Sequence, residues 1–188
     1  MENRTNLLLA NALRFGLALA AVNFIIFLIF YILDFNLSSF TYSIVGFFLD
    51  ITTYFGIFIY SNNILKKVYF GGNLSYGQGF LNSFIGGLVA TITFKFLSSL
   101  FYTFYDPESF TQMISNIIIK MQESGWLTSK ELDELIDSYN KLTPFSFAAQ
   151  QIWMNLIGCL IVALIVSAIT KTKSNPFADQ PEDTNTTI

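Results

Sequence analysis

Long apolar runs separated by polar stretches dominate the hydrophobic pattern of this chain. Each of four runs is long enough to cross the roughly 30 Å of hydrocarbon in a bilayer as a helix of about 20 residues. The pattern predicts four membrane-spanning helices, at residues 7–33, 40–65, 79–105 and 145–170. We therefore predict an all-α integral membrane protein in which residues 1–173 form one four-helix transmembrane domain.

The segment between the third and fourth runs is polar and has helical periodicity. Asp106 is placed to cap a helix that Gly125 can end. Thr128 and Glu131 form a capping box that starts a second short helix. Apolar side chains recur at helical spacing in both, so we predict an extracytoplasmic amphipathic helical hairpin over residues 107–142. Its apolar stripe either packs on the hairpin, the bundle or the headgroup layer, or binds a partner.

The first apolar run has a rival interpretation as a secretory signal, because residues 18–20 read Ala-Leu-Ala, like a cleavage site. Arg14 would interrupt the apolar region of such a signal, and the apolar pattern continues to Leu33, so a spanning helix is the better interpretation. Arg14 itself is either a buried functional charge or a side chain that extends to the headgroups.

Small residues recur every four positions in the first and third runs, where they predict close approach of another helix. The two stripes are Ala12, Gly16 and Ala20, and Gly79, Ser83 and Gly87.

Two charges lie inside the second and third runs. Asp50 is 16 residues before Lys66, and Lys95 is 16 residues after Gly79. At about 1.5 Å per residue, both lie ~24 Å from the inner ends of antiparallel helices. An unpaired charge in a bilayer costs ~2.5–3.5 kcal/mol on insertion scales, so we expect the two to be partners. Asp50, Lys95 and Arg14 are the candidate intramembrane polar cluster.

The composition removes several classes of function. Hydrophobic residues make up 53% of the chain and charged residues only 12%, about half the charged share of a soluble protein. There is no basic patch for nucleic acid and no histidine, and Cys159 is the single cysteine. The glycines between residues 71 and 79 fit neither dinucleotide nor phosphate-loop spacing. We therefore expect no catalytic residue, no cofactor and no metal site, and we expect the protein not to be an enzyme.

Basic residues predict the orientation. With four crossings, one side of the membrane receives six of them: Arg4, Arg14, Lys66, Lys67, Lys171 and Lys173. That side is cytoplasmic by the positive-inside rule, so both termini are inside and the hairpin is outside. We expect a multi-pass protein of the inner (plasma) membrane with a disordered cytoplasmic tail at residues 174–188.

The stretch after the third run also carries a resemblance to a known family. The family pattern begins with an aromatic-rich helix end and an aspartate–proline pair. It continues with a methionine- and glutamate-containing turn and then a threonine–proline entry into a glycine-containing helix. These are Tyr105, Asp106, residues 121–125, Thr143 and Gly158. The chain resembles, over roughly residues 14–171, an uncharacterised family of small bacterial membrane proteins, the domain of unknown function four-one-nine-nine. The resemblance implies a four-helix inner-membrane protein without an assigned activity, so no catalytic residue is carried over.

Three function classes remain. The first is a non-enzymatic bundle that scaffolds or associates with other membrane components, with the lipid bilayer, further copies of the chain or other membrane proteins as partners. The alternative is a small ion or solute transporter or channel subunit that uses Asp50 and Lys95. A membrane enzyme is the weakest, because Asp50 alone offers neither an activated nucleophile nor a metal.

Overall fold

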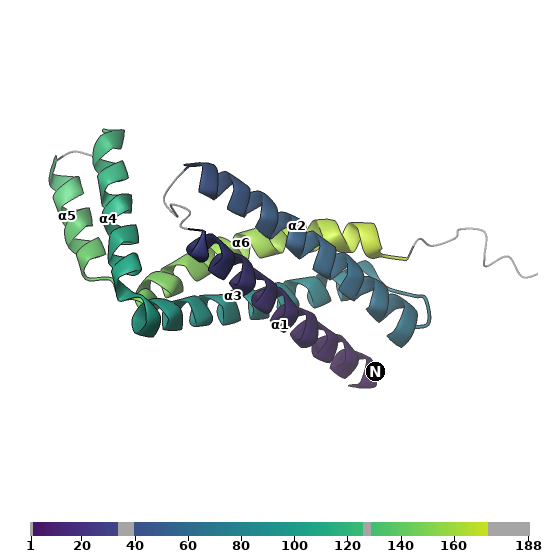
Figure 1. Ribbon diagram of the computed structural model, residues 1–188. Helices are drawn as coiled ribbons and strands as arrows, with labels where there is room; N and C mark the ends of the chain where they lie inside the picture. The colour runs from purple at the N-terminus through teal and green to yellow at the C-terminus, as the bar shows by residue number, and fades with distance from the viewer. Residues whose placement is uncertain (1, 34–39, 126–128, 173–188) are drawn as a thin grey trace, which may run out of the picture.

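The protein is a bundle of long helices with two shorter helices at one end (Figure 1). The computed structural model describes residues 2–33, 40–125 and 129–172. Within these ranges the chain contains helices and no strand. The α-helices are α1 (Glu2–Ile32), α2 (Phe40–Ile64), α3 (Tyr76–Leu100), α4 (Pro107–Ser124), α5 (Ser129–Asn140) and α6 (Pro144–Thr170), and the π-helical turns η1 (Leu65–Tyr69) and η2 (Phe101–Tyr105) extend α2 and α3.

Four of these elements are long and apolar enough to cross a membrane. The candidate spans are Arg4–Ile32, Ile44–Tyr69, Tyr76–Tyr105 and Pro144–Thr170, with 29, 26, 30 and 27 residues and mean hydropathies of 2.5, 1.6, 1.7 and 2.5. At about 1.5 Å per residue each is ~40 Å long, which exceeds the ~30 Å hydrocarbon layer. The predicted all-α fold with four membrane-spanning helices is confirmed by length and composition.

The start of α1 and the end of α6 lie at the same end of the bundle, and α4 and α5 lie at the other (Figure 1). At the first end, which we call the termini end, the Thr172 backbone N–H donates to the Leu74 carbonyl at 2.8 Å. The Arg4 guanidinium lies 5.6 Å from the centre of the Phe70 ring at the same end. Sequential spanning helices are therefore antiparallel.

Several helix boundaries differ from the sequence-based expectation. The first helix begins at Glu2 rather than residue 7, because its polar start continues in helical conformation. The third begins at Tyr76 rather than residue 79, because Ser75 and Gln78 form a capping box. The fourth begins at Pro144, one residue earlier than expected, where Thr143 caps it. The connection expected at residues 66–78 is shortened because η1 prolongs α2.

The small-residue stripes are helix contacts, as predicted. Ala12, Gly16 and Ala20 are all buried along α1. A Cβ on Gly16 would lie 2.5 Å from the Gly86 carbonyl oxygen, so α1 and α3 touch backbone to backbone. A Cβ on Gly87 would collide with the ring of Tyr54 from α2. The stripes are therefore used inside the bundle.

The helix α4 has the boundaries that the sequence predicts. Asp106 caps it through the Ser109 backbone N–H at 3.0 Å, and Gly125 ends it with a left-handed φ of 63°. The Tyr31 hydroxyl of α1 also donates to the Asp106 carboxylate, at 2.6 Å. Thr128, the expected cap of the second short helix, lies outside the described residues.

The apolar face of α4 packs on the end of the bundle. Phe110 and Ile114 are buried against Phe27 of α1 and Tyr102 of η2. Figure 1 shows α5 beside α4, and Tyr139 of α5 packs on the same cluster. Much of the amphipathic stripe is thus occupied by the protein itself.

Candidate functional site

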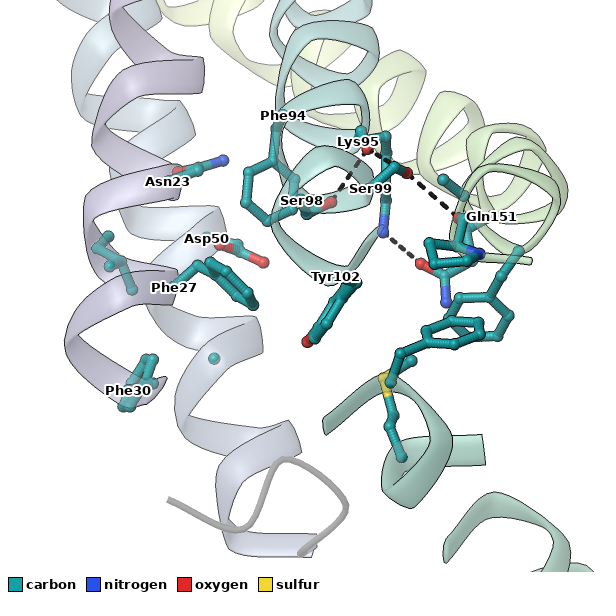
Figure 2. Close-up of a pocket in the computed structure, with 17 residues that line it drawn as sticks. Asn23, Phe27, Phe30, Asp50, Phe94, Lys95, Ser98, Ser99, Tyr102 and Gln151 are labelled. Carbon is teal, nitrogen blue, oxygen red and sulfur yellow. Dashed lines mark hydrogen bonds between the residues drawn. The ribbon is translucent and has the colours of Figure 1, made fainter. Parts of the chain in front are cut away.

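A cavity of about 270 Å³ lies between the spanning helices and is also lined by residues of α4 (Figure 2). Asp50 of α2 and Lys95 of α3 both line it, together with Asn23 of α1 and Gln151 of α6. Phe110 of α4 is one of the lining residues. The two charges that the sequence places at equal depth therefore reach the same cavity.

The hydrogen-bond partner of Lys95 is a neutral side chain and not Asp50. Its ammonium donates to the Gln151 side-chain carbonyl oxygen, and Figure 2 shows this contact crossing from α3 to α6. Its nitrogen also lies 5.7 Å from the centre of the Phe94 ring. An ammonium has three N–H donors, so Lys95 retains capacity for further acceptors.

Asp50 lies across the cavity from this contact. No ion pair within 4.0 Å joins it to Lys95, and no hydrogen bond of its carboxylate is found among the residues that the structure describes. Its side chain is exposed in the isolated chain. Equal depth predicted that Asp50 and Lys95 would be direct partners. The two side chains instead line the same cavity without direct contact.

A second cavity of about 450 Å³ adjoins the first. Asn23, Asp50, Phe94 and Lys95 line both. The second cavity extends between α2 and α6, where its walls are mostly apolar and include Phe47 and several α6 residues. We call the two neighbouring cavities together the α2–α6 opening.

The opening exists because the first half of α2 leaves the bundle. From residue 44 to residue 50, every residue is exposed except Gly46, which is half-buried. Phe47 and Phe48 are 59% and 64% exposed. Figure 1 shows this part of α2 diverging from α6, whereas later α2 residues such as Phe58 are fully buried.

Asn23 adds an unsatisfied acceptor to the opening. Its side-chain oxygen is buried and has no hydrogen-bond partner among the described residues. A buried carbonyl without a donor loses free energy, so such a group marks a place where a water or a ligand would bind favourably.

Arg14 lies elsewhere. It is exposed on α1, and its guanidinium is 5.9 Å from the centre of the Phe15 ring. It lines neither cavity. The structure therefore brings together Asp50 and Lys95 of the candidate cluster, and leaves Arg14 apart.

Sequence reasoning missed a second polar cluster near the termini end. Its amide and hydroxyl side chains come from all four spanning helices and are at most 5% exposed. They are Asn11, Ser61, Asn62, Asn82, Ser83 and Thr170.

Hydrogen bonds connect this cluster into one network centred on Asn82. Its Oδ1 accepts from Asn11 Nδ2 at 3.0 Å, and its Nδ2 donates to Ser61 Oγ at 2.9 Å and to Asn62 Oδ1 at 2.8 Å. The Asn62 Nδ2 donates in turn to Thr170 Oγ1 at 3.0 Å. A fully bonded network of this kind fixes the mutual rotation of the helices.

A packed apolar layer separates the network from the opening. Leu19, Phe58, Ala90 and Val166 form this layer and are at most 4% exposed. Phe58 and Val166 lie, along their own helices, between a residue of the opening and one of the network, and Leu19 and Ala90 line the inner wall of the opening itself. The bundle is thus sealed at the termini end and open at the level of Asp50.

The described residues do not gather candidate metal ligands. No group of three or more His, Cys, Asp or Glu residues among them is arranged to hold a metal ion. Cys159 is buried, with its sulfur 3.5 Å from the Thr91 hydroxyl.

These features define a helical protein with four helices of membrane-spanning character and an ionisable pair in a laterally open cavity. The chain belongs to the family described as Protein of unknown function (DUF4199), whose model matches residues 14–172. The family resemblance seen in the sequence is thereby confirmed. No curated protein and no solved structure shows significant similarity to the chain.

Proposed function

We propose that this is a non-enzymatic protein of the inner (plasma) membrane that binds another membrane component at the α2–α6 opening. The observation that carries the proposal is the Asp50 carboxylate, which lies inside a spanning helix without an ion-pair partner among the described residues. A carboxylate at this depth is unfavourable unless something bound there compensates it.

The opening is a better candidate for the binding surface than the small-residue stripes are. Gly16 and Gly87 are covered by the protein's own helices, so the stripes are not free for a partner helix. The exposed first half of α2, with Phe47 and Phe48, borders the opening and offers an apolar surface beside the two charges.

The distribution of basic residues supports cytoplasmic termini. Arg4, Lys66, Lys67 and Lys171 belong to segments at the termini end, whereas α4 and α5 lie at the other. By the positive-inside rule, α4 and α5 are then on the extracytoplasmic side of the membrane. A reporter fused after residue 188 is expected to be active only in the cytoplasm, and activity only outside would contradict this orientation.

A photoreactive amino acid at position 47 tests binding at the opening. In native membranes, we expect an adduct that decreases about tenfold in Asp50→Asn, because a charge-assisted hydrogen bond is lost. The same amino acid at position 17, which is exposed on α1 away from the opening, is the control for contact with bulk lipid. The proposal would be contradicted if adducts formed at both positions and their yields did not change in the Asp50→Asn variant.

A second candidate function is ion or solute transport. An acid and a base that line one cavity within a membrane support it, because such pairs occur along proton and ion paths. The packed layer of Leu19, Phe58, Ala90 and Val166 opposes it, since this layer closes the cavity on the termini side. Flux into vesicles that is lost in the Asp50→Asn variant would favour transport. Unchanged flux in this variant would exclude transport through Asp50.

A further inference from the structure

We infer that the α2–α6 opening is a binding site for one zwitterionic glycerophospholipid with a primary ammonium and a phosphate, the phosphatidylethanolamine class. The inference rests on the proposed function and names the component that is bound. In this arrangement the phosphate lies at Lys95, the ammonium at Asp50, and an acyl chain in the apolar part of the opening.

The charges of the site select this headgroup. Among the described residues, the Lys95 ammonium donates to the neutral Gln151 oxygen and can donate further hydrogen bonds, which suits a phosphate. The Asp50 carboxylate is an acceptor without a donor among the described residues, which suits an ammonium. An anionic headgroup would leave Asp50 uncompensated, and a quaternary ammonium has no N–H to donate.

The depth of the charges is also appropriate for a headgroup. Asp50 is ten residues from the start of α2 at Phe40, and Lys95 is ten residues from the end of its span at Tyr105. If helices of ~45 Å extend equally beyond a ~30 Å hydrocarbon layer, both charges lie roughly 7–8 Å below its surface. A lipid drawn slightly into the opening reaches them without crossing the membrane.

The apolar part of the opening accounts for an acyl chain. It is lined by Phe47, Met154 and Ile161, which are themselves at the lipid-facing surface. Gly158 also lines it, and a Cβ placed there would meet nothing within 4 Å. A free soluble zwitterion would leave this apolar groove unused, which favours a lipid as the occupant.

Native mass spectrometry of the full-length purified protein tests the inference. The protein in detergent is incubated with dioleoyl phosphatidylethanolamine, phosphatidylcholine or phosphatidylglycerol at equal concentration. We expect phosphatidylethanolamine to be retained about tenfold more than the other two, because among the three only its headgroup offers Asp50 a cation with N–H donors and Lys95 a phosphate. Asp50→Asn is expected to remove this preference without reducing retention of phosphatidylglycerol.

A glycine pair separates a lipid from a free headgroup compound. Gly158→Phe fills the apolar part of the opening and is expected to abolish retention of the lipid. Gly56→Phe is the matched control, because Gly56 also has open space around it but lines neither cavity. Both variants are checked for native helix content and unfolding midpoint, so that a loss of retention is not a loss of fold.

Three results would overturn the inference. Equal retention of the three lipids by the folded protein would mean only non-specific boundary lipid. Soluble phosphoethanolamine that binds the wild type and the Gly158→Phe variant equally well would mean a site for a free zwitterion. A folded protein that retains no lipid, yet still gives an Asp50-dependent protein adduct at position 47, would contradict the lipid and leave the proposed function standing. If that adduct is absent as well, both proposals fail.

Discussion

Lys95 and Gln151, 56 residues apart in the chain, are joined by a hydrogen bond from the ammonium to the amide oxygen. The contact crosses from α3 to α6 and gives the intramembrane lysine a neutral partner. Asp50, the residue of opposite charge at the same depth, therefore faces the opening without a direct partner among the described residues. This separation of the two charges underlies the proposed binding site.

The buried network predicts a large effect of Asn82→Leu on stability. The substitution removes three hydrogen bonds, to Asn11, Ser61 and Asn62. It leaves the buried Asn62 Oδ1 without its donor, whereas Asn11 and Ser61 remain bonded to each other. At ~0.6 kcal/mol for each bond within a membrane, we expect the free energy of unfolding to fall by about 2 kcal/mol. Reversible unfolding in mixed detergent measures this change.

The control for Asn82→Leu is Asn155→Leu. Asn155 is exposed on α6 and has no hydrogen bond of its side chain among the described residues. The same substitution there is expected to change the unfolding free energy by less than about 0.5 kcal/mol. Equal effects at the two positions would show that the network does not stabilise the fold.

The contact between α1 and α3 predicts that Gly16→Ala is destabilising. The added Cβ would lie 2.5 Å from the Gly86 carbonyl oxygen and 3.0 Å from Val89 Cβ, so the helices must separate. The overpacking is expected to cost about 1–3 kcal/mol. Because alanine gains ~1 kcal/mol over glycine within a helix, we expect a net loss of up to about 2 kcal/mol. Gly56→Ala, which meets nothing within 4 Å, is the matched control and is expected to be neutral or slightly stabilising. An unfolding midpoint for Gly16→Ala at or above that of Gly56→Ala would be incompatible with close helix contact.

Asp106 predicts a pH dependence of stability. Hydrogen bonds from Ser109 first, and then from Tyr31, hold the pKa of this carboxyl below its usual range. A carboxyl with a lowered pKa in the folded state stabilises the protein above its unfolded pKa of about 4, and this contribution is lost as the pH falls through the folded pKa. We therefore expect the unfolding midpoint of the wild type to decrease below about pH 4 more steeply than that of Asp106→Asn.

Tyr31→Phe tests the same contact from the other side. It removes the hydroxyl that donates to Asp106 at 2.6 Å. Its destabilisation relative to the wild type is expected at neutral pH and should shrink in acid, where the carboxylate becomes protonated. Parallel pH profiles for the wild type, Asp106→Asn and Tyr31→Phe would show that the Asp106 carboxylate does not contribute.

Much of the fold follows from local signals in the sequence. The apolar runs gave four spanning helices, and Asp106 and Gly125 marked both ends of α4 because capping depends only on neighbouring residues. The boundary at Tyr76 was missed although its signal was present. Ser75 and Gln78 have the spacing of a capping box, but nearby glycines suggested a longer loop.

The candidate site was predictable in depth but not in rotation. Equal depth correctly predicted that Asp50 and Lys95 lie close enough to line one cavity. It could not predict that Lys95 contacts Gln151, because that depends on the rotation of each helix about its axis. The same reasoning about depth would have placed Asn11, Asn62 and Asn82 together near the termini end. It could not show that they point inward, because that depends on packing between helices.

A double-mutant cycle on Asp50→Asn and Lys95→Met tests the central claim most directly. The unfolding free energies of the wild type, both single variants and the double variant are measured in lipid-free detergent. Because the two charges share a cavity without an ion pair, we expect a coupling energy below about 0.5 kcal/mol. A coupling of about 1 kcal/mol or more would mean that Asp50 and Lys95 pair directly. The opening would then hold a structural ion pair, and the proposed binding site would be contradicted.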